Sequence, residues 1–71
     1  MFHPISFSVF RNNVLDYIGR TDLVTITGKS ALIERSGMDF VVSIDRIEVY
    51  RGPVNISAAY ALNMHEVGIN N

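Results

Sequence analysis

Two short segments contain residues found in ligand sites, but neither has the spacing that the chemistry needs. Gly28-Lys29-Ser30 resembles the end of a phosphate-binding loop, whose backbone amides wrap around phosphate oxygens. Such a loop needs a further glycine five residues before Gly28, and that position is Leu23. His65-Glu66 resembles the start of a zinc-protease motif, but the second histidine would stand where Ile69 lies. We therefore expect neither a phosphate site nor a metal site.

The chain also lacks a complete set of residues for nucleophilic or acid–base catalysis. It has no cysteine and two histidines, and a serine or lysine nucleophile needs a base within hydrogen-bond reach. Asp39 and Asp45 would share one face of a strand at a separation of about 20 Å. Paired catalytic carboxylates lie about 5–10 Å apart. The sequence therefore predicts a protein that is not an enzyme and uses no cofactor.

The residues best suited to nucleic-acid binding are Arg46, Tyr50 and Arg51. Small curved sheets bind single strands by stacking bases on exposed aromatic rings beside basic side chains. On one strand Arg46 and Tyr50 would share a face, but Glu48 lies between them. The net charge is −1, and the six basic residues are spread along the chain. A nucleic-acid-binding small barrel is therefore the alternative function, and nucleic acid is not the partner we expect.

Length and composition favour association with another protein molecule. The 71 residues form one small domain, 1–71, in which 48% of residues are apolar and 18% charged. Average domains carry about 25% charged residues. In so short a chain, hydrophobic burial and the entropy of ordering nearly cancel, and disulfides, metals or oligomerisation usually add the missing stability. Without cysteine, self-association or another protein partner is the remaining aid.

The first ten residues bear on localisation. They are apolar, but no lysine or arginine precedes them, and the stretch is too short to span a bilayer. We expect a cytoplasmic protein with no membrane partner.

Hydrophobic periodicity predicts the secondary structure. Apolar residues alternate with polar ones at 5–10, and most clearly at 38–44. Asn12 or Asn13 is expected to cap a short helix that Gly19 ends. Glycine-containing turns separate the middle strands. The predicted strands are 5–10, 23–27, 31–35, 38–44 and 47–51.

The apolar pattern shifts by one position at Asp45-Arg46, since Val42 and Ile44 occupy even positions whereas Ile47 and Val49 occupy odd ones. A bulge or a tight turn would restore the face, and bulges bend sheets. The predicted fold is α+β and β-rich: a curved antiparallel sheet or small open barrel of about five strands, with one short helix and a C-terminal helix. Its predicted core is Phe7, Val9, Val14, Ile18, Val24, Ile26, Leu32, Phe40, Val42, Ile44, Ile47, Val49 and Leu62.

Residues 57–67 fit either a helix or a strand, and their three alanines favour the helix. The segment is apolar on more than one side, so it either completes the core or forms a partner interface. Residues 69–71 are expected to be a frayed end. The candidate interface residues are Ala58, Ala59, Tyr60, Leu62, Met64 and Val67.

These patterns lead to one expectation about function. The chain is expected to be a small non-enzymatic protein–protein interaction module, such as a regulator, adaptor or inhibitor. It is expected to act as a homodimer or larger assembly, because its composition leaves apolar surface for a second molecule to cover.

Overall fold

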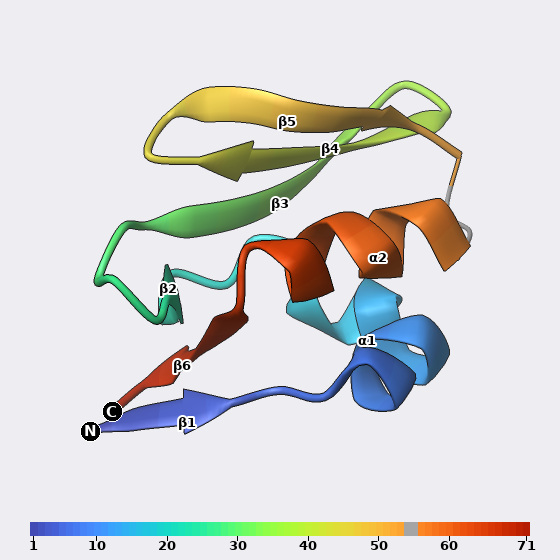
Figure 1. The fold of residues 1–71 in the computed structure, drawn as a ribbon. Coiled ribbons are helices and arrows are strands. Elements are labelled where there is room, and N and C mark those ends of the chain that lie inside the picture. Colours follow the sequence, from blue (N-terminus) through green and yellow to red (C-terminus); the bar gives the residue numbers. More distant parts are fainter. Residues whose placement is uncertain (54–55) are drawn as a thin grey trace.

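The computed structural model of the chain describes residues 1–53 and 56–71 (Figure 1). A 3₁₀ helix, η1, follows directly on α1. The elements in chain order are β1 (Phe2–Pro4), α1 (Phe7–Asn13), η1 (Val14–Tyr17), β2 (Leu23–Thr25), β3 (Ala31–Ser36), β4 (Asp39–Ile44), β5 (Ile47–Gly52), α2 (Ile56–Met64) and β6 (Val67–Asn70).

Within the described residues, the strands form two antiparallel sheets of three strands each. One sheet has the order β1-β6-β2, and the other has the order β3-β4-β5. Both sheets are open, and the predicted α+β, β-rich class is confirmed. Figure 1 shows α2 between the β3-β4-β5 sheet and α1, and shows the two chain ends side by side at β1 and β6.

The core lies where α1, α2 and the two sheets meet. Its largest fully buried side chains include Phe10 from α1, Phe40 from β4 and Leu62 from α2. The core cluster consists of Phe10, Val14, Leu23, Ala31, Ile33, Phe40, Val42, Ile44, Ala59, Leu62 and Val67.

The predicted core is right on β4 and wrong for several other residues. Val14, Phe40, Val42, Ile44 and Leu62 are buried as predicted. Phe7 and Ile18 are partly buried against the cluster, and Val24 and Leu32 are also only partly buried. Both neighbouring positions of β2 and β3 carry apolar side chains, so alternation could not choose the inward face. The residues predicted to be buried that are exposed are Val9, Ile26, Ile47 and Val49.

The predicted strand at 5–10 is wrong, because this segment contains the start of helix α1. The Ser6 side chain accepts a hydrogen bond from the Val9 amide at 3.3 Å and so caps the helix. In the helix, Phe7, Phe10 and Val14 follow a spacing of three and four residues and turn toward the core. Asn13, one of the two expected caps, ends α1 and directly precedes η1, where its side chain makes no capping hydrogen bond.

The apolar shift between β4 and β5 is produced by a tight turn together with a bulge. Ile44 pairs with Ile47 across the two-residue turn Asp45-Arg46, and both turn residues have positive φ angles, 53° and 66°. Farther along, Val42 pairs with Tyr50 and Ser43 with Glu48, so Val49 is the extra residue of a bulge. The prediction of a bulge or turn is confirmed.

The C-terminal elements depart partly from expectation. The predicted helix is present as α2, but the predicted frayed end is wrong because 67–70 form β6, the central strand of its sheet. Gly68 pairs with Pro4 on one side and with Val24 on the other. A Cβ atom at Gly68 would meet the backbone oxygen of His3 and would lie 2.7 Å from Cζ of Phe2.

We expect Gly68→Ala to lower the free energy of unfolding by about 2–3 kcal/mol or more, because a methyl group has no room between β1 and β2. Urea unfolding followed by circular dichroism measures the change. Asn70→Ala, at an exposed position of the same strand, is the control and should change stability by less than about 0.5 kcal/mol. Equal stability of the two variants would contradict this account of β6.

Arg46→Gly is expected to raise the free energy of unfolding by about 0.5–1 kcal/mol. A side chain in the left-handed conformation costs about 1–2 kcal/mol, and the greater entropy of glycine in the unfolded chain offsets part of the gain. Arg46→Ala keeps the Cβ atom and should give no such increase. Thermal unfolding of the three proteins decides between a backbone effect and a side-chain effect.

Candidate functional site

An apolar groove lies where the β2–β3 connection, the β4–β5 hairpin and the C-terminal end of α2 meet. Its volume is about 310 Å³. Four exposed apolar side chains line it, with exposed fractions of 59% for Ile26, 66% for Ile47, 36% for Val49 and 64% for Met64. We use the name apolar groove for the surface formed by these four residues. The segments that carry them lie on the side of the molecule where β4 turns into β5 (Figure 1).

Backbone hydrogen bonds hold the walls of the groove together. The Ile26 amide donates to the Glu66 carbonyl at 3.1 Å, which joins the β2–β3 connection to the residues after α2. The Asp45 amide donates to the Ser30 carbonyl at 2.8 Å, which joins the β4–β5 turn to the same connection. The groove is therefore built from three segments that the tertiary structure brings together.

A buried threonine shapes the β2–β3 connection. The Thr25 hydroxyl oxygen accepts a hydrogen bond from the Lys29 amide at 3.1 Å and lies 2.9 Å from the Thr27 hydroxyl. The Thr25 amide donates to the Lys29 carbonyl, and the Gly28 amide donates to the Thr25 carbonyl. These bonds make Gly28-Lys29-Ser30 part of a compact turn next to an antiparallel strand, whereas a phosphate-binding loop leads into a helix.

The apolar residues of the groove have a charged rim of both signs. Lys29, Asp45, His65 and Glu66 border it. The lining of the groove therefore combines apolar side chains with charges of both signs.

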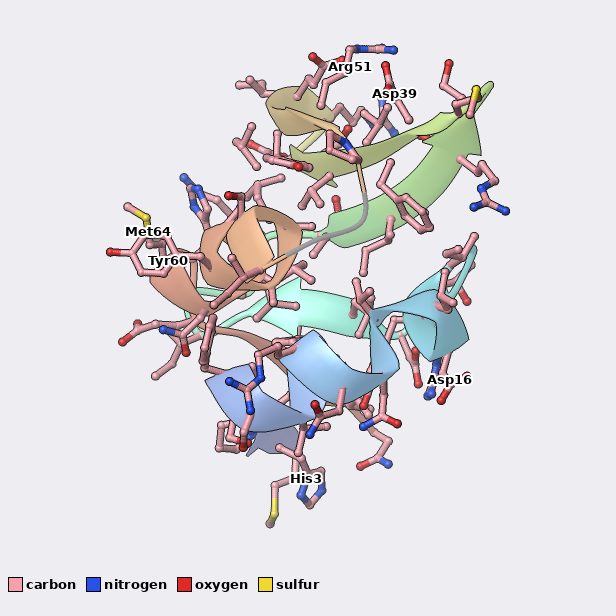
Figure 2. The ribbon with its side chains drawn as sticks, turned by 90° about the vertical axis from the view of Figure 1, so that its right-hand side faces the viewer. His3, Asp16, Asp39, Arg51, Tyr60 and Met64 are labelled. Carbon is pink, nitrogen blue, oxygen red and sulfur yellow. The ribbon has the colours of Figure 1, made fainter. Side chains whose placement is uncertain are left out.

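The six residues of the predicted interface divide into two groups. Ala58, Ala59, Leu62 and Val67 are buried inside the folded chain, where they pack against its other elements. Tyr60 and Met64 are more than half exposed and project from α2 on the same side, one helical turn apart (Figure 2). Of the six, only these two can therefore reach a partner of the folded chain.

Three residues of the apolar groove were not among the predicted interface residues. Ile26, Ile47 and Val49 were assigned to the core from their alternation along strands. The shift of phase at Asp45 was the one signal in the sequence that set Ile47 and Val49 apart from the β4 residues. The exposed position of Ile26 had no such signal.

The structure does not bring Arg46, Tyr50 and Arg51 together on one face. Tyr50 packs against the core and its hydroxyl donates to the Pro53 carbonyl at 2.7 Å. Arg51 lies on the opposite face, where its guanidinium donates to Glu48 at 2.9 Å. The ion pair with Glu48 raises the pKa of Arg51. The bulge at Val49 causes this separation, because it changes the alternation that placed Arg46 and Tyr50 on the same side.

A second, larger concavity has a volume of about 430 Å³ and includes Arg20, Leu32 and Arg46 in its lining. The Arg20 guanidinium lies 5.6 Å from the centre of the Tyr17 ring, and its Nε donates to Asp22 Oδ1 at 2.9 Å. This hydrogen bond lowers the pKa of Asp22 below its ordinary value. Arg20 is thus engaged with its own chain.

We expect Arg20→Gln to raise the pKa of Asp22 toward its ordinary value, because the charged donor is removed. A lowered carboxyl pKa adds stability above the unfolded-state pKa, and this contribution is lost as the pH falls through the folded-state pKa. The variant should therefore lose less stability than the parent protein on acidification. An NMR titration of the Asp22 carboxyl measures the shift, and Arg51→Gln should leave it unchanged.

Within residues 1–53 and 56–71, no three histidine, aspartate or glutamate side chains come together as a metal site. Neither α1 nor α2 has the length and apolar character that crossing a membrane requires. The chain matches no protein-family model, no curated protein and no solved structure.

Proposed function

We propose that this protein is a non-enzymatic interaction module that binds a second copy of itself through the apolar groove. The observation that carries the proposal is the exposure of Ile26, Ile47, Val49 and Met64 on one surface. Soluble monomers seldom gather large apolar side chains in this way, and such surfaces are typical of protein–protein contacts.

The residue types of the groove support the proposal. Ile47 and Val49 stand at alternate positions of β5, and yet both lie outside the core. A second molecule that covered them would add apolar burial to a small domain, which has little of its own. Self-association would therefore contribute stability as well as a binding surface.

The rim supports a second copy as the occupant. Most homo-oligomers are symmetric dimers, in which the same surface of each copy faces the other. The rim carries Lys29 on one wall and Asp45 and Glu66 on the others. In a symmetric contact, acidic groups of one copy can face the lysine of the other, so the rim is compatible with itself.

The remaining parts of the proposal rest on the sequence. The absence of a nucleophile–base set supports a protein that acts by presenting a surface, as a regulator, adaptor or inhibitor does. A cytoplasmic location is also part of the proposal, and fractionation of cells that express the protein would test it.

Met64→Gln is expected to weaken self-association about tenfold or more, because it places a polar amide where apolar surface would be buried in each copy. Met38→Gln is the matched control. Met38 is 94% exposed at the β3–β4 turn and is outside the groove, so the same substitution there should have no effect. Sedimentation equilibrium over a wide concentration range measures both dissociation constants.

Two results would refute the proposal. One is a parent protein that stays monomeric at the highest concentration at which it remains in solution. The other is a dimer that Met64→Gln and Met38→Gln leave equally stable. Circular dichroism of each variant confirms that a loss of association does not reflect unfolding.

A further inference from the structure

The outer edge of β5 is the sheet edge that borders the apolar groove. Four strands end a sheet in the described part of the chain: β1, β2, β3 and β5. β1 and β2 have three residues each, and β1 ends at Pro4. The edge of β3 is partly occupied by other segments of the chain. The Ile33 carbonyl accepts a hydrogen bond from the Gly19 amide at 2.8 Å, and Ser30, just before β3, forms a bridge with Val24. β5 is the six-residue terminal strand that borders the apolar groove.

The pairing with β4 indicates which residues of β5 face outward along the edge. Ile47 closes a two-residue hairpin with Ile44, so its backbone groups point toward β4. Tyr50 pairs with Val42, two residues farther along β4, and has the same orientation. The direction of the backbone groups alternates from one residue to the next along an antiparallel strand. Glu48 follows Ile47 and Arg51 follows Tyr50, so the amide and carbonyl groups of Glu48 and Arg51 point toward the outer edge.

The side chains of Glu48 and Arg51 carry opposite charges on the same face of the strand. Their ion pair has an N–O distance of 2.9 Å, and the two side chains are 44% and 48% exposed. Arg51 is labelled in Figure 2, on the outer side of the β3-β4-β5 sheet, away from Tyr60 and Met64. Along the edge, the acid Glu48 and the base Arg51 therefore lie at equal distances from the point midway between Val49 and Tyr50.

We propose that two copies of this chain pair antiparallel along β5, with a twofold axis between Val49 and Tyr50. This inference rests on the proposed self-association and specifies its geometry. The partner's Arg51 lies opposite Glu48, and by symmetry the partner's Glu48 lies opposite Arg51. The outward backbone groups of these residues form the hydrogen bonds between the two strands, and the two sheets become one.

Charge favours this register, because it is the one in which Glu48 and Arg51 face each other. An axis centred on Glu48 would place the two glutamates opposite each other, and one centred on Arg51 would do the same to the arginines. Opposite charges facing each other across strands stabilise a pair, and like charges destabilise it. With the axis between Val49 and Tyr50, the dimer has two attractive pairs of Glu48 and Arg51. In this register neither residue faces a like charge.

The apolar residues of β5 are complementary in the same register. Val49 lies opposite the partner's Tyr50, and β-branched residues pair favourably with aromatic ones across strands. Ile47 lies opposite the partner's Gly52, which leaves room for the larger side chain. Val49 and Tyr50 both lie on the inner face of their strand, as directly opposed residues must. The pairing places the Val49 walls of the two apolar grooves on the same face of the joined sheet, on either side of the twofold axis.

Two charge reversals test the register. Glu48→Arg alone, or Arg51→Glu alone, replaces both attractive pairs of the dimer with repulsive ones. Each variant should raise the dissociation constant of its own homodimer about tenfold or more. An equal mixture of the two variants should form a heterodimer within about threefold of the parent affinity, because every arginine then faces a glutamate of the other chain. Sedimentation with one variant fluorescently labelled measures the heterodimer.

The mixture separates contacts between chains from the ion pair within one chain. That internal pair stays broken in both variants, so its loss cannot explain a recovery of affinity on mixing. Glu34→Arg on β3 and Arg11→Glu on α1 make the same changes in net charge at other exposed positions, and their mixture should behave as the parent does.

The outcomes distinguish the two proposals. A parent dimer that neither reversal weakens overturns the β5 pairing and leaves self-association intact. A weakened pair of variants that does not recover on mixing also overturns this register. A monomeric parent protein refutes the proposed function itself. Because both charges are exposed, we expect the variants to fold, and the double variant Glu48→Arg/Arg51→Glu, which restores opposite charges, should dimerise as the parent does.

Discussion

The close approach of β1 to β6 at Gly68 is the constraint on which the arrangement of this chain depends. β6 can lie between β1 and β2 only because position 68 carries no side chain, since a Cβ atom would meet the His3 backbone and the Phe2 ring. β6 follows α2 after two residues, so its position also sets where α2 ends. The first and last strands thus hold α2 between α1 and the β3-β4-β5 sheet.

The position of α2 in turn creates the apolar groove. The helix ends next to the β2–β3 connection, and the Glu66 carbonyl accepts the Ile26 amide there. The β4–β5 turn meets the same connection through Ser30. Three segments distant in sequence are therefore held at fixed positions, and the apolar side chains that they carry cannot all reach the core.

The groove and the paired edge share one strand, β5. Ile47 and Val49 line the groove from β5, whereas Glu48 and Arg51 occupy the other face of the same strand. The bulge at Val49 produces this division, because it moves Arg51 onto the face of Glu48. Bulges commonly protect an edge against pairing with arbitrary strands. Here the bulge sets a spacing that only a strand with the same irregularity matches, which would restrict the pairing to a second copy.

The sequence by itself determined the β-rich class, the three strands β3, β4 and β5, and the irregularity between β4 and β5. These features depend on neighbouring residues, namely strict alternation, turn-forming glycines and a break in phase.

Tertiary structure decided the rest. Ile5, Phe7 and Val9 alternate as in a strand, but the Ser6 cap and burial of Phe10 against η1 and α2 favour a helix. β2 and β3 are apolar on both faces, so their pairing partners, and not their own composition, chose which side chains became buried. The same long-range packing left Ile26, Ile47 and Val49 at the surface.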